Sequence, residues 1–302
     1  MAGFTIDLAG RVKNFDLPKT QPLIPLFEAV VNSIYAIEER KESEDFIGKI
    51  DIRIVREPQE VATLDGIDST INEITGFTVS DNGIGLDENN MKSFLQSDST
   101  YRAAKGGKGV GRFSWLKAFD CTKITSVYKD DDCWVKREFD FSLDNLDIDD
   151  VLKDAQETEY CTTVELISYK SAYRKHVGKS TESIATKIMQ HCMIYLMSSN
   201  CPIISVIDEE RYCINDMFEK RITREEDAVD IFIGNEKFSL VNAKIEDESV
   251  GGSKIYLYAN ERMVKPIDLD KALVDLDKNI YDDKGYYYVG ILTGKYLDDN
   301  VE

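Results

Sequence analysis

The stretch GGKGVGRFS, residues 106–114, decides how the sequence around it is interpreted. Four glycines within six residues let backbone N–H groups approach an anion closely, because no Cβ intervenes and positive φ costs little. Apolar residues at Phe113, Leu116 and Phe119 then predict a helix, and the N-terminus of a helix favours phosphate. The spacing matches neither a Walker loop nor a dinucleotide fingerprint. The stretch therefore predicts either a phosphate-binding loop or a flexible glycine linker before an ordinary helix.

Residues 22–41, PLIPLFEAVVNSIYAIEERK, predict an amphipathic helix on the N-terminal side of this loop. Apolar side chains recur there at helical spacing, and Pro25 suits the first turn. Glu28, Asn32 and Ala36 fall on a second row of the same helix, four residues apart. Glu28 and Asn32 are polar residues in apolar surroundings, which indicates either a functional pair or a solvated helix edge.

A strand that ends in a carboxylate follows between these two segments. The sequence ITGFTVSD runs an apolar strand into Asp81, and Gly83 and Gly85 follow in a turn. Asp81 is placed to accept a hydrogen bond from an amino group of a ligand, or it serves only an Asx-type turn, which D-N-G favours. A later strand, YCTTVELIS, adds the hydroxyl groups of Thr162 and Thr163 to a β-branched run.

Composition limits the class of protein. The 302 residues include 37 basic and 56 acidic side chains, and the formal net charge is −19. This charge opposes general attraction to DNA or to an anionic membrane. Six scattered cysteines without a C-x-x-C pair, and only two histidines, predict reduced thiols rather than structural zinc. No segment approaches the roughly 18 apolar residues of a membrane span, and we expect a cytoplasmic protein.

The rest of the chain alternates strand and helix patterns. CTKITSVY and CWVKREFDF predict a hairpin around residues 130–132, and DNLDIDDVLKD predicts a solvated excursion. From about residue 170, Lys179 and Ser180 can cap a helix through IATKIMQHCMIYLMS. The segments ISVID, DIFIG, KFSLVNAKI, SKIYLYAN and YYYVGIL then predict strands around one further helix, DLDKALVDLD.

The order of these motifs resembles the GHKL ATPase superfamily of gyrase B, the ninety-kilodalton heat-shock chaperones, histidine kinases and MutL. The resemblance covers roughly residues 20–168 and implies the Bergerat fold. We therefore expect an α+β protein in which residues 1–168 form a two-layer α/β sandwich of Bergerat type, with an ATP lid at about 94–111. Residues 169–302 resemble, more loosely, a smaller α/β transducer domain of the ribosomal S5 type, expected to be incomplete at its C-terminus.

The resemblance also implies a role for each motif residue. Glu28 would be the general base that polarises the attacking water, and Asn32 would hold Mg²⁺. Asp81 would accept from the adenine amino group with help from Thr162. Cys161 stands where the family usually has glycine, which leaves the register of the two threonines open. The implied ATP-binding residues are Asn32, Ala36, Asp81, Gly83, Gly85, Gly106, Gly107, Lys108, Gly109, Val110, Gly111 and Thr162, with Lys108 directed at the phosphates or at solvent.

The implied function is slow, Mg²⁺-dependent ATP hydrolysis. Glu28, in place of the Asn or His of histidine kinases, favours hydrolysis by water over phosphoryl transfer to protein. ATP would close the lid, drive homodimerisation and signal to an effector beyond Glu302, where the transducer lysine or arginine is also expected; Lys265 and Lys295 are internal candidates. The alternatives are an ATP-gated interaction module with negligible turnover, and a structural protein whose glycines only make turns. The expectation from general resemblance is a prokaryotic ATPase similar to the heat-shock chaperones, either stand-alone or defence-associated.

Overall fold

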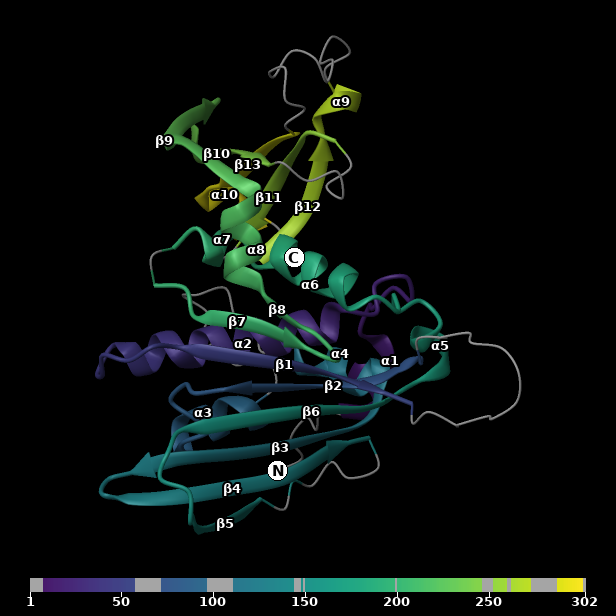
Figure 1. Cartoon of the computed structure of the whole chain (residues 1–302), viewed down its shortest axis with the longest axis vertical. Coiled ribbons are helices and arrows are strands. Elements are labelled where there is room, and N and C mark those ends of the chain that lie inside the picture. Colours follow the sequence, from purple (N-terminus) through teal and green to yellow (C-terminus); the bar gives the residue numbers. More distant parts are fainter. Residues whose placement is uncertain are drawn as a thin grey trace, which may run out of the picture. The chain divides into compact units, whose positions relative to one another are not determined.

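The protein is a mixed α+β chain with two mixed β-sheets (Figure 1). It divides into two compact units, the first within Met1–Thr100, Lys108–Ile188 and Asn200–Ile214, the second within Met189–Ser199 and Asn215–Glu302. The computed structural model describes residues 8–57, 72–96, 111–143, 148, 150–198, 200–245, 252–259, 262–272 and 287–300.

The first unit is built on an eight-stranded sheet in the order β5-β4-β3-β6-β2-β1-β7-β8. Neighbouring strands are antiparallel except β1 and β7, which are parallel. Buried and more exposed residues alternate along β1, because successive side chains point to opposite faces of a sheet. The strands are β1 (Lys49–Arg56), β2 (Ile74–Asp81), β3 (Phe119–Asp130), β4 (Cys133–Ser142), β5 (Val151–Asp154), β6 (Cys161–Tyr169), β7 (Ile203–Ile207) and β8 (Arg211–Cys213).

Helices α2 and α4 lie on one face of this sheet (Figure 1). Helix α2 lies on β1 and β2, α4 lies on β3, and the two helices also contact each other. Pro25 occupies the first turn of α2, and its carbonyl oxygen accepts a hydrogen bond of 2.9 Å from the indole N–H of Trp115 on α4. The helices that begin in this unit are α1 (Leu8–Asn14), α2 (Ile24–Lys41), α3 (Glu88–Leu95), α4 (Arg112–Ala118), α5 (Ser171–Arg174), α6 (Thr181–His191) and α8 (Ile214–Arg221).

The second unit contains a five-stranded sheet in the order β12-β11-β13-β10-β9. Its strands are antiparallel except for the parallel pair β11 and β13. Tyr258 of β11 is fully buried and donates its hydroxyl hydrogen to the carbonyl oxygen of Gln190 at 3.2 Å. The remaining elements are α7 (Met193–Leu196), β9 (Ile222–Ile233), β10 (Glu236–Ile245), β11 (Lys254–Ala259), β12 (Arg262–Asp268), α9 (Leu269–Ala272), β13 (Tyr287–Thr293) and α10 (Lys295–Asn300).

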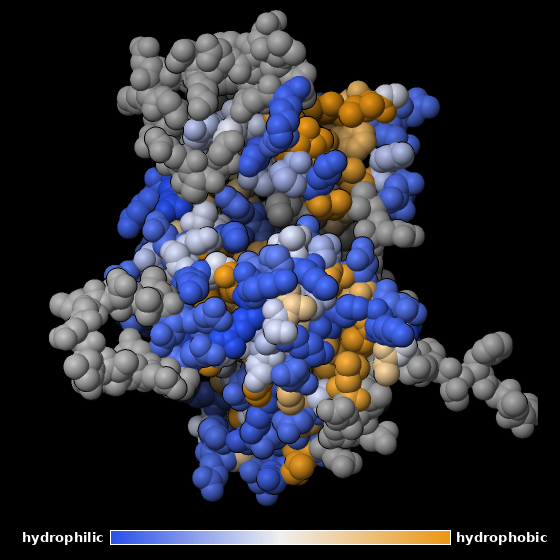
Figure 2. Space-filling view, turned by 90° about the vertical axis from the view of Figure 1, so that its right-hand side faces the viewer, coloured by the Kyte–Doolittle hydropathy of each residue, from blue (hydrophilic) through white to orange (hydrophobic). Residues whose placement is uncertain are grey.

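The described surface of the first unit is largely hydrophilic on the face that Figure 2 presents. None of the six cysteines, all of which lie in the described part of the chain, forms a disulfide. Within the described residues, no helix is long and apolar enough to span a membrane.

Most of the predicted elements are present. The helix around Glu28, the strand that ends at Asp81, the hairpin around residues 130–132 and the T-T-V strand are confirmed as α2, β2, the β3–β4 pair and β6. Asp131, at the tip of that hairpin, has a φ of 51°, a value that aspartate tolerates in tight turns. The predicted cap is also confirmed, because Ser180 Oγ accepts the amide N–H of Ser183 at 3.3 Å.

Three local predictions were wrong. The acidic stretch before residue 155 contains a strand, β5, which pairs with β4 although all four of its residues are exposed. Phe119 opens β3 instead of continuing the helix, and its ring lies 4.0 Å from that of Tyr169, measured between centroids. The long helix expected after Ser180 is interrupted at Cys192, between α6 and α7.

The first unit also extends beyond residue 168, where we expected its domain to end. Strand β7 pairs in parallel with β1, so that Ile50 lies opposite Ile204 in the sheet. This pairing adds β7 and β8 to the first sheet rather than to the second. The pattern ISVID predicted the strand correctly, but a hydrophobic pattern does not specify a strand's partner.

An ionic network ties this added part to the sheet. Arg56, at the end of β1, donates from Nε and Nη2 to Asp208 Oδ2 at 2.9 and 2.6 Å. Its guanidinium also donates to the carbonyl oxygens of Asn72 and Lys179, and Thr181 donates its hydroxyl hydrogen to Asp208 at 2.6 Å. The side chains of Arg56 and Asp208 are only 15% and 12% exposed, so water screens this pair less than a surface pair.

We expect this network to make the stability of the fold fall in acid. Burial raises the pKa of Asp208, but the hydrogen bonds from Arg56 and Thr181 and the charge of Arg56 outweigh it and lower the pKa below its ordinary 3.8. A carboxyl group with a lowered pKa stabilises the fold above about pH 4, and this contribution disappears as the pH falls through the folded-state pKa. Asp208→Asn should flatten the dependence of Tm on pH below pH 4.

The measurement is thermal unfolding followed by circular dichroism between about pH 2 and pH 7. Asp230→Asn is the matched control, because Asp230 pairs with Lys237 at 2.9 Å while more than half exposed. Equal acid sensitivity of the Asp208→Asn variant and the unaltered protein would contradict the prediction.

Candidate functional site

The predicted row on α2 is present and partly accessible. Glu28, Asn32 and Ala36 lie one helical turn apart, and each is neither fully buried nor fully exposed. The rise of an α-helix separates the first and last of them by about 12 Å along the axis. The row therefore presents a carboxylate, an amide and a small side chain in succession along the helix.

Gly111, the last glycine of the Gly-rich stretch, lies against the Glu28 end of this row. A Cβ on Gly111 would overlap Oε2 of Glu28 and would lie 2.7 Å from its Cδ. Gly111 is the N-cap of α4, and Ser114 donates both its amide and its hydroxyl hydrogen to the Gly111 carbonyl oxygen. The fold thus brings the end of the predicted phosphate loop next to the predicted general base.

The turn after β2 lies against the other end of the row. The amide N–H of Ile84 donates to the carbonyl oxygen of Ala36 at 2.9 Å, and a Cβ on Gly83 would lie 2.6 Å from the carbonyl carbon of Ala36. Only glycine permits this approach. Gly85 has a φ of +87°, and a Cβ there would lie 2.6 Å from Cβ of Tyr128. Both glycines predicted to shape the turn are therefore required by contacts with neighbouring elements.

Asp81, at the end of β2, is a buried acceptor beside this turn. Its carboxylate accepts a hydrogen bond of 2.7 Å from the Ser33 hydroxyl and one of 2.9 Å from the amide of Gly83, and the residue is 6% exposed. These two hydrogen bonds fix the orientation of the Asp81 carboxylate at the end of β2.

The strand register distinguishes the two threonines. Thr162 lies directly opposite Asp81 in the β2–β6 pair, while Thr163 lies opposite Ser80 and bonds to its hydroxyl at 3.0 Å. Thr162 is 8% exposed and its hydroxyl lies 2.9 Å from that of Ser126. Because neighbouring side chains alternate between faces, Thr162 shares the face of Asp81 and Thr163 does not.

Two further residues hold the turn, and the sequence did not single them out. Ser126 accepts the amide N–H of Leu86 at 2.9 Å. Arg137 is buried in β4, donates to the carbonyl oxygens of Leu86 and Asp87, and pairs with Glu88. A charged residue on the inward face of a strand, as the alternation of β4 places Arg137, is the signal that could have identified it.

The structure does not bring every predicted site residue to the row on α2. Gly106, Gly107, Lys108, Gly109 and Val110 lie outside the described residues. The predicted lid at 94–111 is described only at its two ends, where Arg112 donates to the carbonyl oxygen of Gln96 at 2.7 Å. Lys265 lies on β12 and Lys295 opens α10, both in the second unit.

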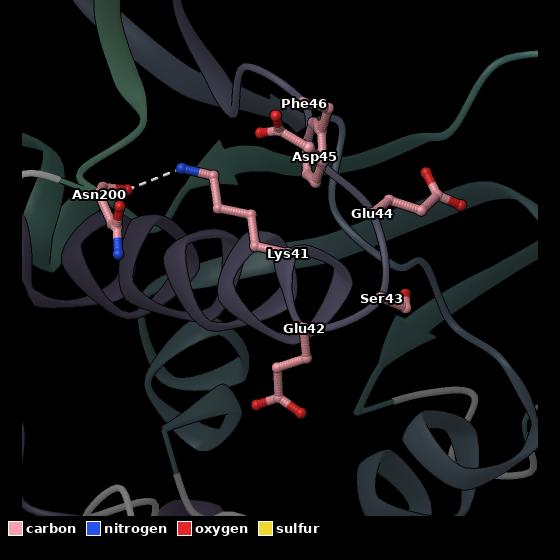
Figure 3. Close-up of a pocket in the computed structure, with 7 residues that line it drawn as sticks. All are labelled: Lys41, Glu42, Ser43, Glu44, Asp45, Phe46 and Asn200. Atoms are coloured by element: carbon pink, nitrogen blue, oxygen red, sulfur yellow. Dashed lines mark hydrogen bonds between the residues drawn. The ribbon is translucent and has the colours of Figure 1, made fainter.

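A polar hollow of about 400 Å³ lies at the C-terminal end of α2 (Figure 3). Figure 3 shows Lys41 reaching across it to the carbonyl oxygen of Asn200, a bond of 2.9 Å. About 13 helical residues, or roughly 20 Å, separate this end of α2 from Glu28. The hollow is therefore distinct from the row of predicted site residues. It is lined by Lys41, Glu42, Ser43, Glu44, Asp45, Phe46 and Asn200.

Within the described part of the chain, no group of three or more His, Cys, Asp or Glu side chains is arranged to hold a metal ion. No known family model matches this sequence, and no curated protein matches it.

A matched pair of glycine substitutions separates the two ends of the site. Gly111→Ala should leave Tm nearly unchanged, because its φ of −55° and ψ of −38° suit alanine and only the flexible Glu28 carboxylate must move. Gly83→Ala should destabilise the fold by about 2 kcal/mol, because the new Cβ meets the backbone of α2. Thermal unfolding of the two purified variants tests this, and equal loss of Tm would contradict it.

Proposed function

We propose that this chain binds ATP along the Glu28–Asn32–Ala36 row of α2 and hydrolyses it. The observation that carries the proposal is the meeting of two segments, distant in the sequence, on one helix. The end of the Gly-rich stretch lies at Glu28, and the turn after Asp81 lies at Ala36. The proposal includes the GHKL resemblance and the Bergerat form of the first sheet.

The Asp81 end would hold the base. Asp81 would accept a hydrogen bond from the adenine amino group, and the glycine at position 83 would let the ring lie against backbone. Thr162 supports this role, because it lies opposite Asp81 in the sheet. The Ser33 and Gly83 hydrogen bonds fix the orientation of the carboxylate before a ligand arrives. Preorganised acceptors of this kind favour binding, because little ordering is left to occur on association.

The Glu28 end would hold the triphosphate and the attacking water. The Glu28 carboxylate lies directly against Gly111, in the position that the side chain of any other residue there would take. Glu28 would orient the water and accept its proton. Asn32, one turn further along α2, offers a neutral amide oxygen as a ligand for Mg²⁺. The phosphates of the nucleotide and water would supply the other ligands. Bound Mg²⁺ would neutralise charge that develops on the phosphate oxygens.

We further propose that ATP binding promotes homodimerisation and signals through the second unit to an effector. These steps, the transducer character of the second unit and a defence-associated role rest on the resemblance. The homodimer is tested by light scattering without nucleotide, with ATP and with a non-hydrolysable analogue.

The direct test is displacement of a fluorescent ATP analogue, combined with an assay of phosphate release in the presence of Mg²⁺. ATP should displace the analogue at least about tenfold better than GTP, because guanine presents a carbonyl oxygen where Asp81 needs an amino donor. Failure of ATP to displace the probe would refute the proposal. Displacement without phosphate release would instead favour the ATP-gated interaction module.

A further inference from the structure

Arg40 is the next member of the row that carries the proposed site. It follows Ala36 by four residues on α2, and its side chain is 14% exposed. An arginine so far removed from water needs partners for its five N–H donors. The sequence shows the four-residue spacing, but its pattern does not distinguish Arg40 from an ordinary basic residue near the C-terminus of a helix.

The guanidinium of Arg40 lies between two aromatic rings. Its Cζ is 4.0 Å from the centroid of Phe46 and 3.9 Å from that of Tyr160, well inside the range of a cation–π contact. Glu44 accepts from Nε at 3.0 Å and from Nη2 at 2.7 Å. We call Arg40, Phe46, Tyr160 and Glu44 the Arg40 clamp.

The clamp fixes one further atom, the carbonyl oxygen of Asn82. Arg40 Nη1 donates to this oxygen at 2.7 Å, and Asn82 is the residue that follows Asp81. The Asn82 side chain in turn accepts the amide N–H of Lys49 at 2.8 Å and donates to the carbonyl oxygen of Ile47 at 3.0 Å. Arg40 thus binds the carbonyl oxygen of the Asn82–Gly83 peptide group, and the N–H of the same peptide group donates to the Asp81 carboxylate.

The clamp also joins the ends of β2 and β6, the two strands that meet at the proposed base site, because Arg40 contacts both Asn82 and Tyr160. Tyr160 immediately precedes β6, two residues before Thr162, and its ring lies 5.0 Å from that of Trp134, between centroids. Burial raises the pKa of the Tyr160 phenol, so the ring stays neutral at physiological pH. On its outer side, Glu44 and Phe46 line the hollow at the end of α2 (Figure 3).

We propose that Arg40 is a positioning residue for base recognition: it holds the Asn82 peptide between α2 and β6 and thereby sets Asp81 and the Gly83 amide for the adenine ring. The inference rests on the proposed function, because it assigns Arg40 to the base end of that site. It does not involve the phosphate end, since Arg40 lies three helical turns beyond Glu28.

The test separates the base from the phosphates. A fluorescent ATP analogue bound to the full chain is displaced with ATP, with adenosine and with inorganic tripolyphosphate. Arg40→Ala should weaken displacement by ATP and by adenosine about tenfold each and leave displacement by tripolyphosphate unchanged. In the phosphate-release assay, the loss caused by Arg40→Ala should appear in the KM for ATP.

Arg174→Ala is the matched control. Arg174 is also partly buried in the first unit, and it pairs with Glu57 and, at 3.0 Å, with Glu73. It should alter none of the three affinities. Phe46→Leu keeps Arg40 and removes one ring, so it should give a smaller loss of the same kind if Arg40→Ala fails to fold.

The possible outcomes are distinct. If the unaltered chain binds ATP but Arg40→Ala and Phe46→Leu leave the affinity for adenosine unchanged, this inference is overturned and the proposed function stays intact. Equal weakening of adenosine and tripolyphosphate would also overturn it, because that result indicates general loosening of the fold. Absence of any nucleotide binding by the unaltered chain would refute the proposed function and this inference together.

Discussion

Asp81→Asn is expected to weaken ATP binding by about a hundredfold while the protein stays folded. The amide has the shape of the carboxylate and can still accept the Gly83 N–H, while the Ser33 hydroxyl can rotate to accept from it. The charge and one acceptor oxygen are lost, and hydrogen bonds to charged groups contribute about 1.5 to 3 kcal/mol. Displacement of a fluorescent ATP analogue measures the affinity, and circular dichroism confirms the fold.

Asp51→Asn is the control for this substitution. Asp51 lies on β1 opposite Ser80, so its side chain points to the other face of the sheet from Asp81. It is 39% exposed and pairs with Arg211, an interaction of the kind that contributes little. Asp51→Asn should bind ATP as the unaltered chain does. If Asp81→Asn also retained full affinity, Asp81 would not be the residue that receives the base.

Glu28→Ala is expected to retain ATP binding and to lose turnover by a factor of about 10² to 10⁴, the range contributed by a positioned general base. Glu28 faces Gly111 at the proposed phosphate end, and the contacts of Asp81 at the proposed base end are unchanged. Phosphate release at saturating ATP measures the turnover. Glu38→Ala, on another face of the same helix, is the control and should change neither quantity.

A double substitution tests whether Glu28 and Gly111 act together. In the unaltered background, Gly111→Ala should reduce turnover, because its Cβ displaces the Glu28 carboxylate. In the Glu28→Ala background, the same substitution meets no carboxylate and should cost nothing further. Such non-additivity is the signature of residues in contact. Full hydrolysis by Glu28→Ala would remove Glu28 from the catalytic role, whatever the outcome of the cycle.

The elements that carry the site could be predicted because each has a strong local pattern. The apolar row and Pro25 define α2, and the run of apolar residues into Asp81 defines β2. Helical and extended periodicity depend only on neighbouring residues. For the same reason the spacing of Glu28, Asn32 and Ala36 on one row followed directly from the sequence.

Pairing between distant segments could not be predicted in this way. Strand β7 was recognised, but its place beside β1 depends on backbone hydrogen bonds that carry no side-chain signature. Strand β5 consists of four exposed residues and is formed by pairing with β4, against the expectation from its acidic surroundings. The first unit therefore extends beyond the expected boundary at residue 168, because β7 and β8 belong to its sheet.

The amino-acid sequence was enough to identify the residue types at this site and the helix or strand that carries each of them, since those properties are local. The folded structure was needed to show that Gly111 lies against Glu28, that Thr162 rather than Thr163 shares the sheet face of Asp81, and that Arg40 reaches Asn82. Each of these depends on the register of strands or on the packing of a helix against a turn. Such relations follow from the close fit of segments far apart in the chain, which one-dimensional periodicity does not encode.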